Sequence, residues 1–357
     1  ATATNTTVIR HDSAQALPRR CCARKSSGMI PLRRSQASVA AFPWALVSAL
    51  AVGICAVAPP PVAPPSAPAL ETSSDQFLSL HDAIGTMLPG AQKVVNLTSN
   101  SRYVVDGSPV VISNASLALQ SDGTATIDGQ GSSGLFIISG RGAVLGVHGV
   151  VLFNGSRMEA SPLVVTNDGQ TLARSVGQGG AIEARDGAYV LLRSVHVSNC
   201  VARRGGGVML DNAGLVCENC LFTDCVAQLE GGAIGTSNGE LLGLGIDGTE
   251  ESLSLVIIES TLANCSAKSG GGLMMEEGTL IASHCSFNNC QSFVEGGAVC
   301  ELKRVQDLRS GLGKLRKSSF LYCTFTDCTS TTGAALYTVG CDLELVLCSV
   351  SRAVSAA

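Results

Sequence analysis

A short motif built on two glycines recurs down the second half of this chain, and it constrains the fold more than any other feature. In each copy a small residue and then an aliphatic residue follow the glycines. The copies are Gly179–Ile182, Gly206–Met209, Gly231–Ile234, Gly271–Met274 and Gly296–Val299, with a weaker copy at Gly333–Leu336. Their second glycines lie 27, 25, 40 and 25 residues apart. A fixed period in the twenties predicts supersecondary units that stack on one another.

A second motif precedes each glycine pair and reads apolar, any, Asn or Asp, Cys, any, small. Its cysteines are Cys200, Cys225, Cys265, Cys290 and Cys328. Between the motifs lie short runs of aliphatic residues, such as Leu253–Ile258, bounded by Gly, Asn and Ser as strands are. A unit of about 25 residues made of short strands cannot bury its own apolar face, so the units must coil and pair in parallel. The sequence predicts an all-β fold, a single-stranded parallel β-helix of about nine rungs over residues 89–357.

Two of the repeats are longer than the others. Their extra residues are Thr236–Glu251 and Lys303–Lys317, and both segments fall after the glycine strand and before the next apolar strand. One corner of the coil therefore accepts loops while the remainder keeps its register. Because loops on one face of a solenoid often bind partners, these two are the predicted contact sites. Insertions tolerated at an exposed turn are the alternative.

The repeats resemble those of the polymorphic outer-membrane protein family, whose signature pairs GGA[ILV] with FxxNxA. GGAI is unaltered at Gly179–Ile182 and Gly231–Ile234, and Phe222 and Ala227 match the second motif, while cysteine stands where that family usually has asparagine. The glycine motifs also look like those of right-handed parallel β-helix, pectin-lyase-like proteins. The resemblance covers roughly Gly90–Arg352 and implies the fold. It implies little about activity, because the superfamily includes adhesins, lyases and hydrolases.

The chain before the repeats falls into four segments. Residues 1–40 carry seven basic residues against one acid and form a basic arm, which leaves about −10 on the rest of a chain whose net charge is −4. Residues 41–58 lack charge and predict a transmembrane signal anchor, with a cleaved signal peptide or a plastid transit peptide as alternatives. Residues 59–73 form a proline-rich linker. Residues 74–88 have apolar side chains at helical spacing and predict a helix that caps the open end of the coil.

These segments predict a location at a membrane, with the β-helix extracellular or luminal; a secreted or plastid-targeted protein is the alternative. No capping segment follows Cys348, and the chain begins without methionine, so a fragment at both ends is expected.

Most of the cysteines belong to the repeats, since twelve of the fifteen lie between Cys200 and Cys348. Five residues before the motif cysteines a second column reads Val195, Cys220, Ser260, Cys285, Cys323 and Cys348. Because Val and Ser also occur there, we interpret both columns as buried stacks of small side chains. Disulfides between Cys285 and Cys323 or between Cys323 and Cys348 are the alternative in an oxidising compartment. No metal site is predicted, because Cys217-x-x-Cys220 stands alone.

The sequence offers weak catalytic candidates. It lacks the paired aspartates, the Gly-His-Gly and the Arg-x-Lys of polygalacturonase-type enzymes, although Ile127–Gly131 resembles a stretch common near their start. Glu230 and Glu295 occupy the same repeat position two rungs apart, so about 10 Å should separate their backbones. That spacing suits an inverting pair of carboxylates. Two solvated corner residues are the alternative, and no cofactor is predicted.

Composition narrows the function further. Aromatic residues make up 4% of the chain, and its one tryptophan, Trp44, lies in the apolar segment, which disfavours sugar stacking. The acidic repeat region disfavours nucleic acid. Asn96, Asn114 and Asn154 begin glycosylation triplets, if the domain is luminal or extracellular. We therefore expect a non-catalytic, membrane-anchored or secreted scaffold or adhesion module for a protein or polysaccharide partner. A polysaccharide lyase or glycoside hydrolase and a structural wall component are the alternatives.

Overall fold

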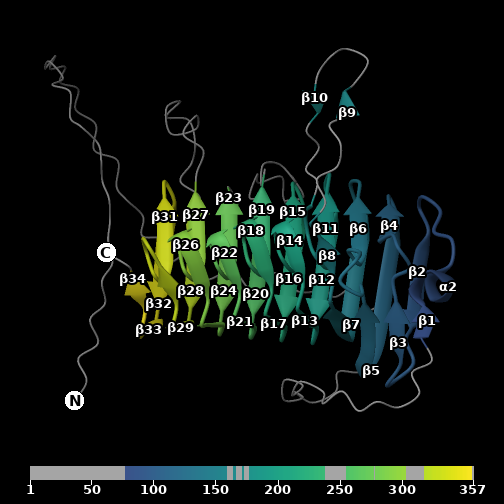
Figure 1. Cartoon of the computed structure of the whole chain (residues 1–357), viewed down its shortest axis with the longest axis horizontal. Coiled ribbons are helices and arrows are strands. Elements are labelled where there is room, and N and C mark those ends of the chain that lie inside the picture. The colour runs from purple at the N-terminus through teal and green to yellow at the C-terminus, as the bar shows by residue number, and fades with distance from the viewer. Residues whose placement is uncertain are drawn as a thin grey trace, which may run out of the picture. The chain divides into compact units, whose positions relative to one another are not determined.

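The structure is a computed structural model, and it is described here over the following residues. They are 77–158, 164–165, 171–172, 177–237, 255–276, 278–302 and 317–355. Most of them form short strands that stack in parallel into a β-helix solenoid (Figure 1). The predicted fold class is confirmed.

One rung in the middle of the coil shows how the chain turns. It consists of β11 (Ile182–Arg185), β12 (Tyr189–Arg193), β13 (His196–Ser198) and β14 (Val201–Arg204). The chain then turns at Gly205 and begins the next rung with β15 (Val208–Asp211), which pairs in parallel with β11. Each strand of the rung therefore stacks on its equivalent in the rungs on either side.

The largest sheet contains two columns of strands. The first column is β2 (Gln92–Asn96), β5 (Ser116–Asp128), β7 (Val144–Phe153), β12, β16 (Gly214–Glu218), β20 (Leu255–Ile258), β24 (Leu280–Ser283), β28 (Lys317–Leu321) and β32 (Asp342–Val346). The second is β1 (Phe77–Ser79), β3 (Arg102–Val104), the ends of β5 and β7, β13, β17 (Leu221–Thr223), β21 (Thr261–Ala263), β25 (Ser286–Asn288), β29 (Thr324–Thr326) and β33 (Ser349–Ser351). The nine strands of the first column agree with the nine rungs that the sequence predicts.

Two smaller sheets close the coil. The sheet that follows each glycine turn holds β4 (Val110–Ser113), β6 (Phe136–Ser139), β11, β15, β19 (Ile234–Ser237), β23 (Leu273–Glu276), β27 (Val299–Leu302) and β31 (Leu336–Val339). We call it the glycine-turn sheet. The sheet that precedes the turn holds β8 (Ser156–Arg157), β14, β18 (Val226–Glu230), β22 (Ser266–Ser269), β26 (Gln291–Glu295), β30 (Thr329–Ser330) and β34 (Val354–Ser355). We call it the pre-turn sheet.

The register of the glycine motif differs by one residue from the alignment that the sequence suggests. The turn glycines, all with φ between 61° and 65°, are Gly179, Gly205, Gly231, Gly270, Gly296 and Gly333. The second and fourth copies therefore begin one residue earlier, at Gly205 and Gly270, because each contains three glycines in a row. Strand pairing agrees, since Ile182 lies opposite Val208 and Val208 opposite Ile234. The turn glycines are thus 26, 26, 39, 26 and 37 residues apart.

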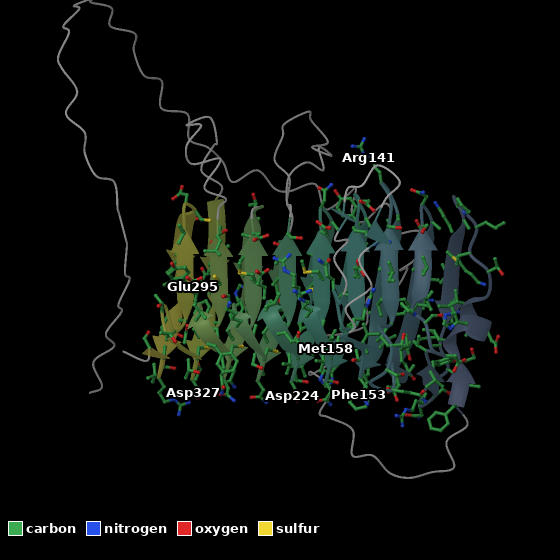
Figure 2. All side chains as sticks on the ribbon, turned by 45° about the horizontal axis from the view of Figure 1, so that its top comes forward. Arg141, Phe153, Met158, Asp224, Glu295 and Asp327 are labelled. Atoms are coloured by element: carbon green, nitrogen blue, oxygen red, sulfur yellow. The ribbon has the colours of Figure 1, made fainter. Side chains whose placement is uncertain are left out.

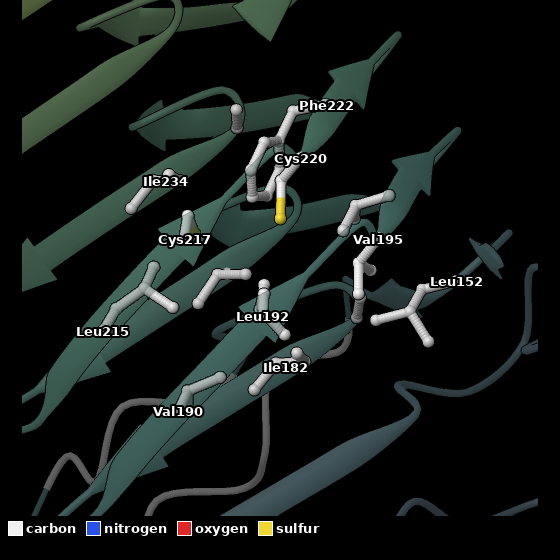
Figure 3. Close-up of a cluster of buried hydrophobic side chains, with 14 of the residues drawn as sticks. Leu152, Ile182, Val190, Leu192, Val195, Leu215, Cys217, Cys220, Phe222 and Ile234 are labelled. Carbon is white, nitrogen blue, oxygen red and sulfur yellow. The ribbon is translucent and has the colours of Figure 1, made fainter. Parts of the chain in front are cut away.

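A continuous core runs along the inside of the coil. Successive rungs contribute matched apolar side chains, and Figure 3 shows Val190 and Leu192 on one rung beside Leu215 and Cys217 on the next. All four are buried. Another column of the core consists of Phe222, Leu262, Phe287 and Phe325, all fully buried. This ladder packing is what lets a unit of about 25 residues bury its apolar face.

The N-terminal helix is shorter than predicted. Within 74–88, the structure describes residues from 77 onward, where β1 pairs with β3 and only α2 (Leu80–Ile84) is helical. Ser79 caps α2 by accepting a hydrogen bond from the amide of Asp82, and Gly85 ends it. Leu80 and Ile84 are buried, so α2 closes the first end of the core, where Figure 1 places it. The predicted bounds were wrong because strand pairing outcompeted helix propensity at the start.

The predicted loops lie mostly outside the described residues. Thr236 and Ser237 are still part of β19, and Lys317 begins β28. The two long connections are therefore residues 238–254 and 303–316. Both connect the glycine-turn sheet to the first column of the large sheet, as predicted. A third insertion was missed: it joins β8 to β11 and contains β9 (Val164–Val165) paired antiparallel with β10 (Thr171–Leu172).

The predicted basic arm, anchor and linker, residues 1–73, also lie outside the described residues. Within the described ranges, no helix has the length and apolar character needed to cross a membrane.

Candidate functional site

The two candidate acids lie on one ladder at the corner between the pre-turn and glycine-turn sheets. That ladder runs through Gln178, Arg204, Glu230, Ser269, Glu295 and Thr332. Glu230 and Glu295 are thus separated by the Ser269 rung, about 9.6 Å in backbone terms. Figure 2 shows Glu295 part-way up the coil, away from the row of corner side chains that contains Asp224 and Asp327.

Two β-bulges bring the acids to this corner. β18 and β26 each have five residues, whereas β14 and β22 have four, and the register shifts between them. The bulge in β18 takes up one extra residue, so Glu230 still pairs with Arg204 of the shorter β14. Bulges of this kind re-aim side chains and are common beside functional sites.

Glu230 is already engaged in an ion pair. Its carboxylate lies 2.5 Å from the guanidinium of Arg204, and the same guanidinium lies 3.9 Å from the carboxylate of Glu276. Burial raises the pKa of Glu230, and the nearby charge of Glu276 raises it further, while the positive charge of Arg204 opposes both. Glu230 therefore has the raised pKa of a general acid but also a fixed cationic partner.

Glu295 has different neighbours. Burial is the largest cause of the raised pKa of Tyr337, and the charge of Glu295 is the second. Cys300, which pairs with Tyr337 on the neighbouring strand, is fully buried, and burial followed by the charge of Glu295 raises the pKa of its thiol. A buried thiol with a raised pKa is not an activated nucleophile. Met209 and Met274, also buried, lie in the same column of the glycine-turn sheet, with Gly235 between them.

A second ion-pair group, missed by sequence reasoning, lies on the same face closer to the N-terminus. Glu183 is 1% exposed and accepts a hydrogen bond from Arg157, while the guanidinium of Arg185 lies 3.6 Å away. Gly134 makes room, because a Cβ there would lie 2.5 Å from the Arg157 side chain. Burial raises the pKa of Glu183 against the opposing charges of both arginines. The sequence held one signal for this group: Glu183 is charged, whereas the equivalent residues of the next two rungs, Met209 and Gly235, are not.

The stretch Ile127–Gly131, which resembles enzyme sequences, has a structural role here. Asp128 is fully buried, and one carboxylate oxygen accepts a hydrogen bond of 2.8 Å from Nε of Arg102. Its other oxygen accepts from the amide of Gln130 at 2.7 Å and closes the turn. Arg102 in turn lies over the ring of Phe77, 5.2 Å from its centroid. Asp128 therefore fixes a corner of the early rungs.

The three glycosylation candidates lie at different kinds of position. Asn96 ends β2, is exposed and accepts a hydrogen bond from Gln120. Asn114 and Asn154 occupy corners with φ of 50° and 51°, the first exposed and the second half-buried. Modification of these residues stays a prediction.

Both cysteine columns are buried inside the corners of the coil, apart from the half-buried Cys348. All described cysteines have free thiols. In the first column each thiol donates to the carbonyl two residues before it, as Cys265 does to Ala263 at 3.2 Å and Cys328 does to Thr326 at 3.4 Å. In the second column Ser260 donates to Ile258 at 2.7 Å in the same way. Cys and Ser donate to the same carbonyl position, which is compatible with their exchange in this column, whereas Val195 has no donor there.

No family model, curated protein or solved structure matches this chain. Within the described ranges, no group of three or more His, Cys, Asp or Glu side chains is arranged to hold a metal ion.

Proposed function

We propose that this chain is a non-catalytic β-helix scaffold that presents its surface to a protein or polysaccharide partner. The observation that supports this most is the ion pair at the acidic corner, where Arg204 already pairs with Glu230. A glycosidase pair instead needs carboxyl groups free to act as acid and base. The resemblance of the GGAI motifs to polymorphic outer-membrane and pectin-lyase-like repeats is compatible with this role.

The location and the contact sites belong to the same proposal. The apolar segment 41–58 would anchor the chain at a membrane, with the coil extracellular or luminal. The two long connections, 238–254 and 303–316, begin at the ends of β19 and β27, which lie on either side of β23. Their starting points are therefore about 9.6 Å apart, close enough for both to contact one partner.

The full chain should be tested against a panel of acidic and neutral polysaccharides for both retention and new reducing ends. Retention on at least one polysaccharide without cleavage is expected for a polysaccharide partner, and neither retention nor cleavage for a protein partner. Replacing residues 239–251 and 304–316 with short Gly-Ser linkers should abolish retention while leaving the circular dichroism spectrum unchanged. Undiminished retention by that variant would exclude the loops as contact sites.

The second candidate function is a polysaccharide lyase or glycoside hydrolase. It is favoured by the placement of Glu230 and Glu295 on one ladder and by the raised pKa of Glu230. If the panel shows cleavage, Glu230→Gln and Glu295→Gln should each reduce the rate at least about 100-fold. Glu259→Gln, at an exposed corner, is the matched control and should have no effect.

A further inference from the structure

Glu301 is an acidic side chain inside the core of the coil. It lies on β27 in a column that faces inward, with Met275 on one side and Thr338 on the other. Ala184 and Leu210, at the same position in earlier rungs, belong to the hydrophobic core. Glu301 is 0% exposed, so its carboxyl group lies in the interior, between the apolar Met275 and the polar Thr338.

No charge compensates this carboxyl group within the described ranges. Both of its oxygens are buried and lack a hydrogen-bond partner, and the same is true of the hydroxyl of Ser318. Ser319 of β28 pairs with Ile281 of the preceding rung. Ser318, one residue earlier, therefore stands where the preceding rung has Leu280. Its hydroxyl is the one side chain whose interaction favours the charged form of Glu301. A single hydroxyl offsets little of the cost of burying a carboxylate.

Among the described residues, the strands packed against Glu301 bring no charged group that shifts its pKa. Met275 comes from β23, Ser318 from β28 and Thr338 from β31. On its own strand, the adjacent Cys300 projects to the opposite side of β27, and burial, followed by the charges of Glu295 and of Glu301 itself, raises the pKa of its thiol. An ionised Glu301 would therefore be an isolated charge in an apolar interior, where neutralisation is the less costly state.

We propose that Glu301 is an internal proton-binding site that couples pH to the order of the rungs from β27 to β34. In the closed coil the carboxyl group carries its proton, and loss of that proton to solvent accompanies local opening of these rungs. Burial raises the pKa of Glu301 from 4.5 to about 7, so the switch falls close to neutral pH. The inference does not depend on the proposed function.

The direction of the pH effect follows from the raised pKa. Between 4.5 and about 7 the open state has lost this proton while the closed state keeps it, so the closed state binds more protons. The stability that this proton gives the closed state is therefore fully present below pH 4.5 and is lost as the pH rises through about 7. The full range corresponds to a change of about 300-fold in the population of the open state, as an upper limit.

Hydrogen exchange of the full chain and of Glu301→Gln, from pH 4 to pH 8.5, tests this. At each pH the ratio of wild-type to variant exchange rates in β27, β28, β31 and β32 cancels the intrinsic chemistry. The ratio should be near one at pH 4 and rise by about 30-fold or more above pH 7. Glu259→Gln should show no pH-dependent ratio, because that side chain is exposed.

A ratio that stays at one at every pH would overturn the proposal. Should Glu301→Gln fail to fold, the wild type alone suffices, with β12, β13, β16 and β17 as the internal reference. The protection of β27–β32 relative to those strands, corrected for intrinsic rates, must then fall between pH 5 and pH 8. A relative protection that does not change with pH would contradict the assignment in that case as well.

Discussion

The two glycines of each motif have different roles, which Gly231 and Gly232 illustrate. Gly231 has a φ of 65°, a conformation that costs side-chain-bearing residues energy, and a Cβ there would lie 2.2 Å from the carbonyl oxygen of Ile234. For Gly232, a Cβ would lie 2.0 Å from the carbonyl oxygen of Gly271 on the next rung. The first glycine therefore permits the turn, and the second permits the rungs to approach each other.

Gly231→Ala should destabilise the protein by more than about 3 kcal/mol, because it adds a backbone clash to the strain of positive φ. Gly107→Ala is the matched control: its φ is 71°, but a Cβ there would meet nothing within 4 Å, so only about 1 kcal/mol should be lost. Urea unfolding followed by circular dichroism measures both. Equal losses would show that the close approach at Gly231 contributes nothing.

At the scale of the element, an aromatic column joins the later rungs. Phe287 on β25 stacks on Phe325 of β29, with ring centroids 4.9 Å apart and planes at 9°. Phe320 of β28 meets both rings edge-on, at 6.4 Å and 5.8 Å. Three rings from three strands thus interlock, and all are fully buried. Such pairs contribute beyond the area that they bury.

Phe287→Ala should therefore cost about 3–5 kcal/mol, because it leaves a cavity in a ladder that cannot collapse without losing strand register. Phe293→Ala, six residues further along, is the control, since that side chain is 79% exposed on β26 and its loss should change stability by less than about 0.5 kcal/mol. Thermal unfolding of the two variants separates these effects. Similar melting temperatures would mean that the aromatic column does not hold the rungs together.

At the scale of the whole coil, stability should vary from rung to rung, because each rung contacts only its neighbours. The middle rungs have buried side chains on both sides, as at Val190 and Leu215. The last described rung differs: Leu343 and Val350 point inward yet are only half-buried, and Leu347 is 73% exposed. The first rung instead has α2 packed against it.

Hydrogen exchange of the unmodified full chain should show this gradient. Amides of β32, β33 and β34 should exchange before those of β12, β13, β16 and β17, since an end rung loses fewer contacts when it opens. Peptide-level mass spectrometry at a single pH is sufficient. Uniform protection along the coil would show that the last rung is covered in solution.

The sequence by itself determined the architecture, because the signals for a solenoid are local and repeated. The glycine motif, the cysteine motif and the short aliphatic runs each predict a turn, a narrow corner or a strand, and their common period predicts the number of rungs. It also placed Glu230 and Glu295 on one ladder, and the interpretation of the cysteine columns as stacks of small side chains agrees with the free thiols of the described residues.

Only the tertiary structure decided which side chains meet. The register of the glycine triplets, the pairing of Arg204 with Glu230 and the burial of Glu183 beneath Arg157 all depend on residues 26 apart that a one-residue bulge or shift would separate. Glu301 is the clearest case, since its sequence neighbours do not distinguish it from an exposed strand residue. Its isolation follows from what the rungs on either side place against it, and that is a property of the stack and not of any single repeat.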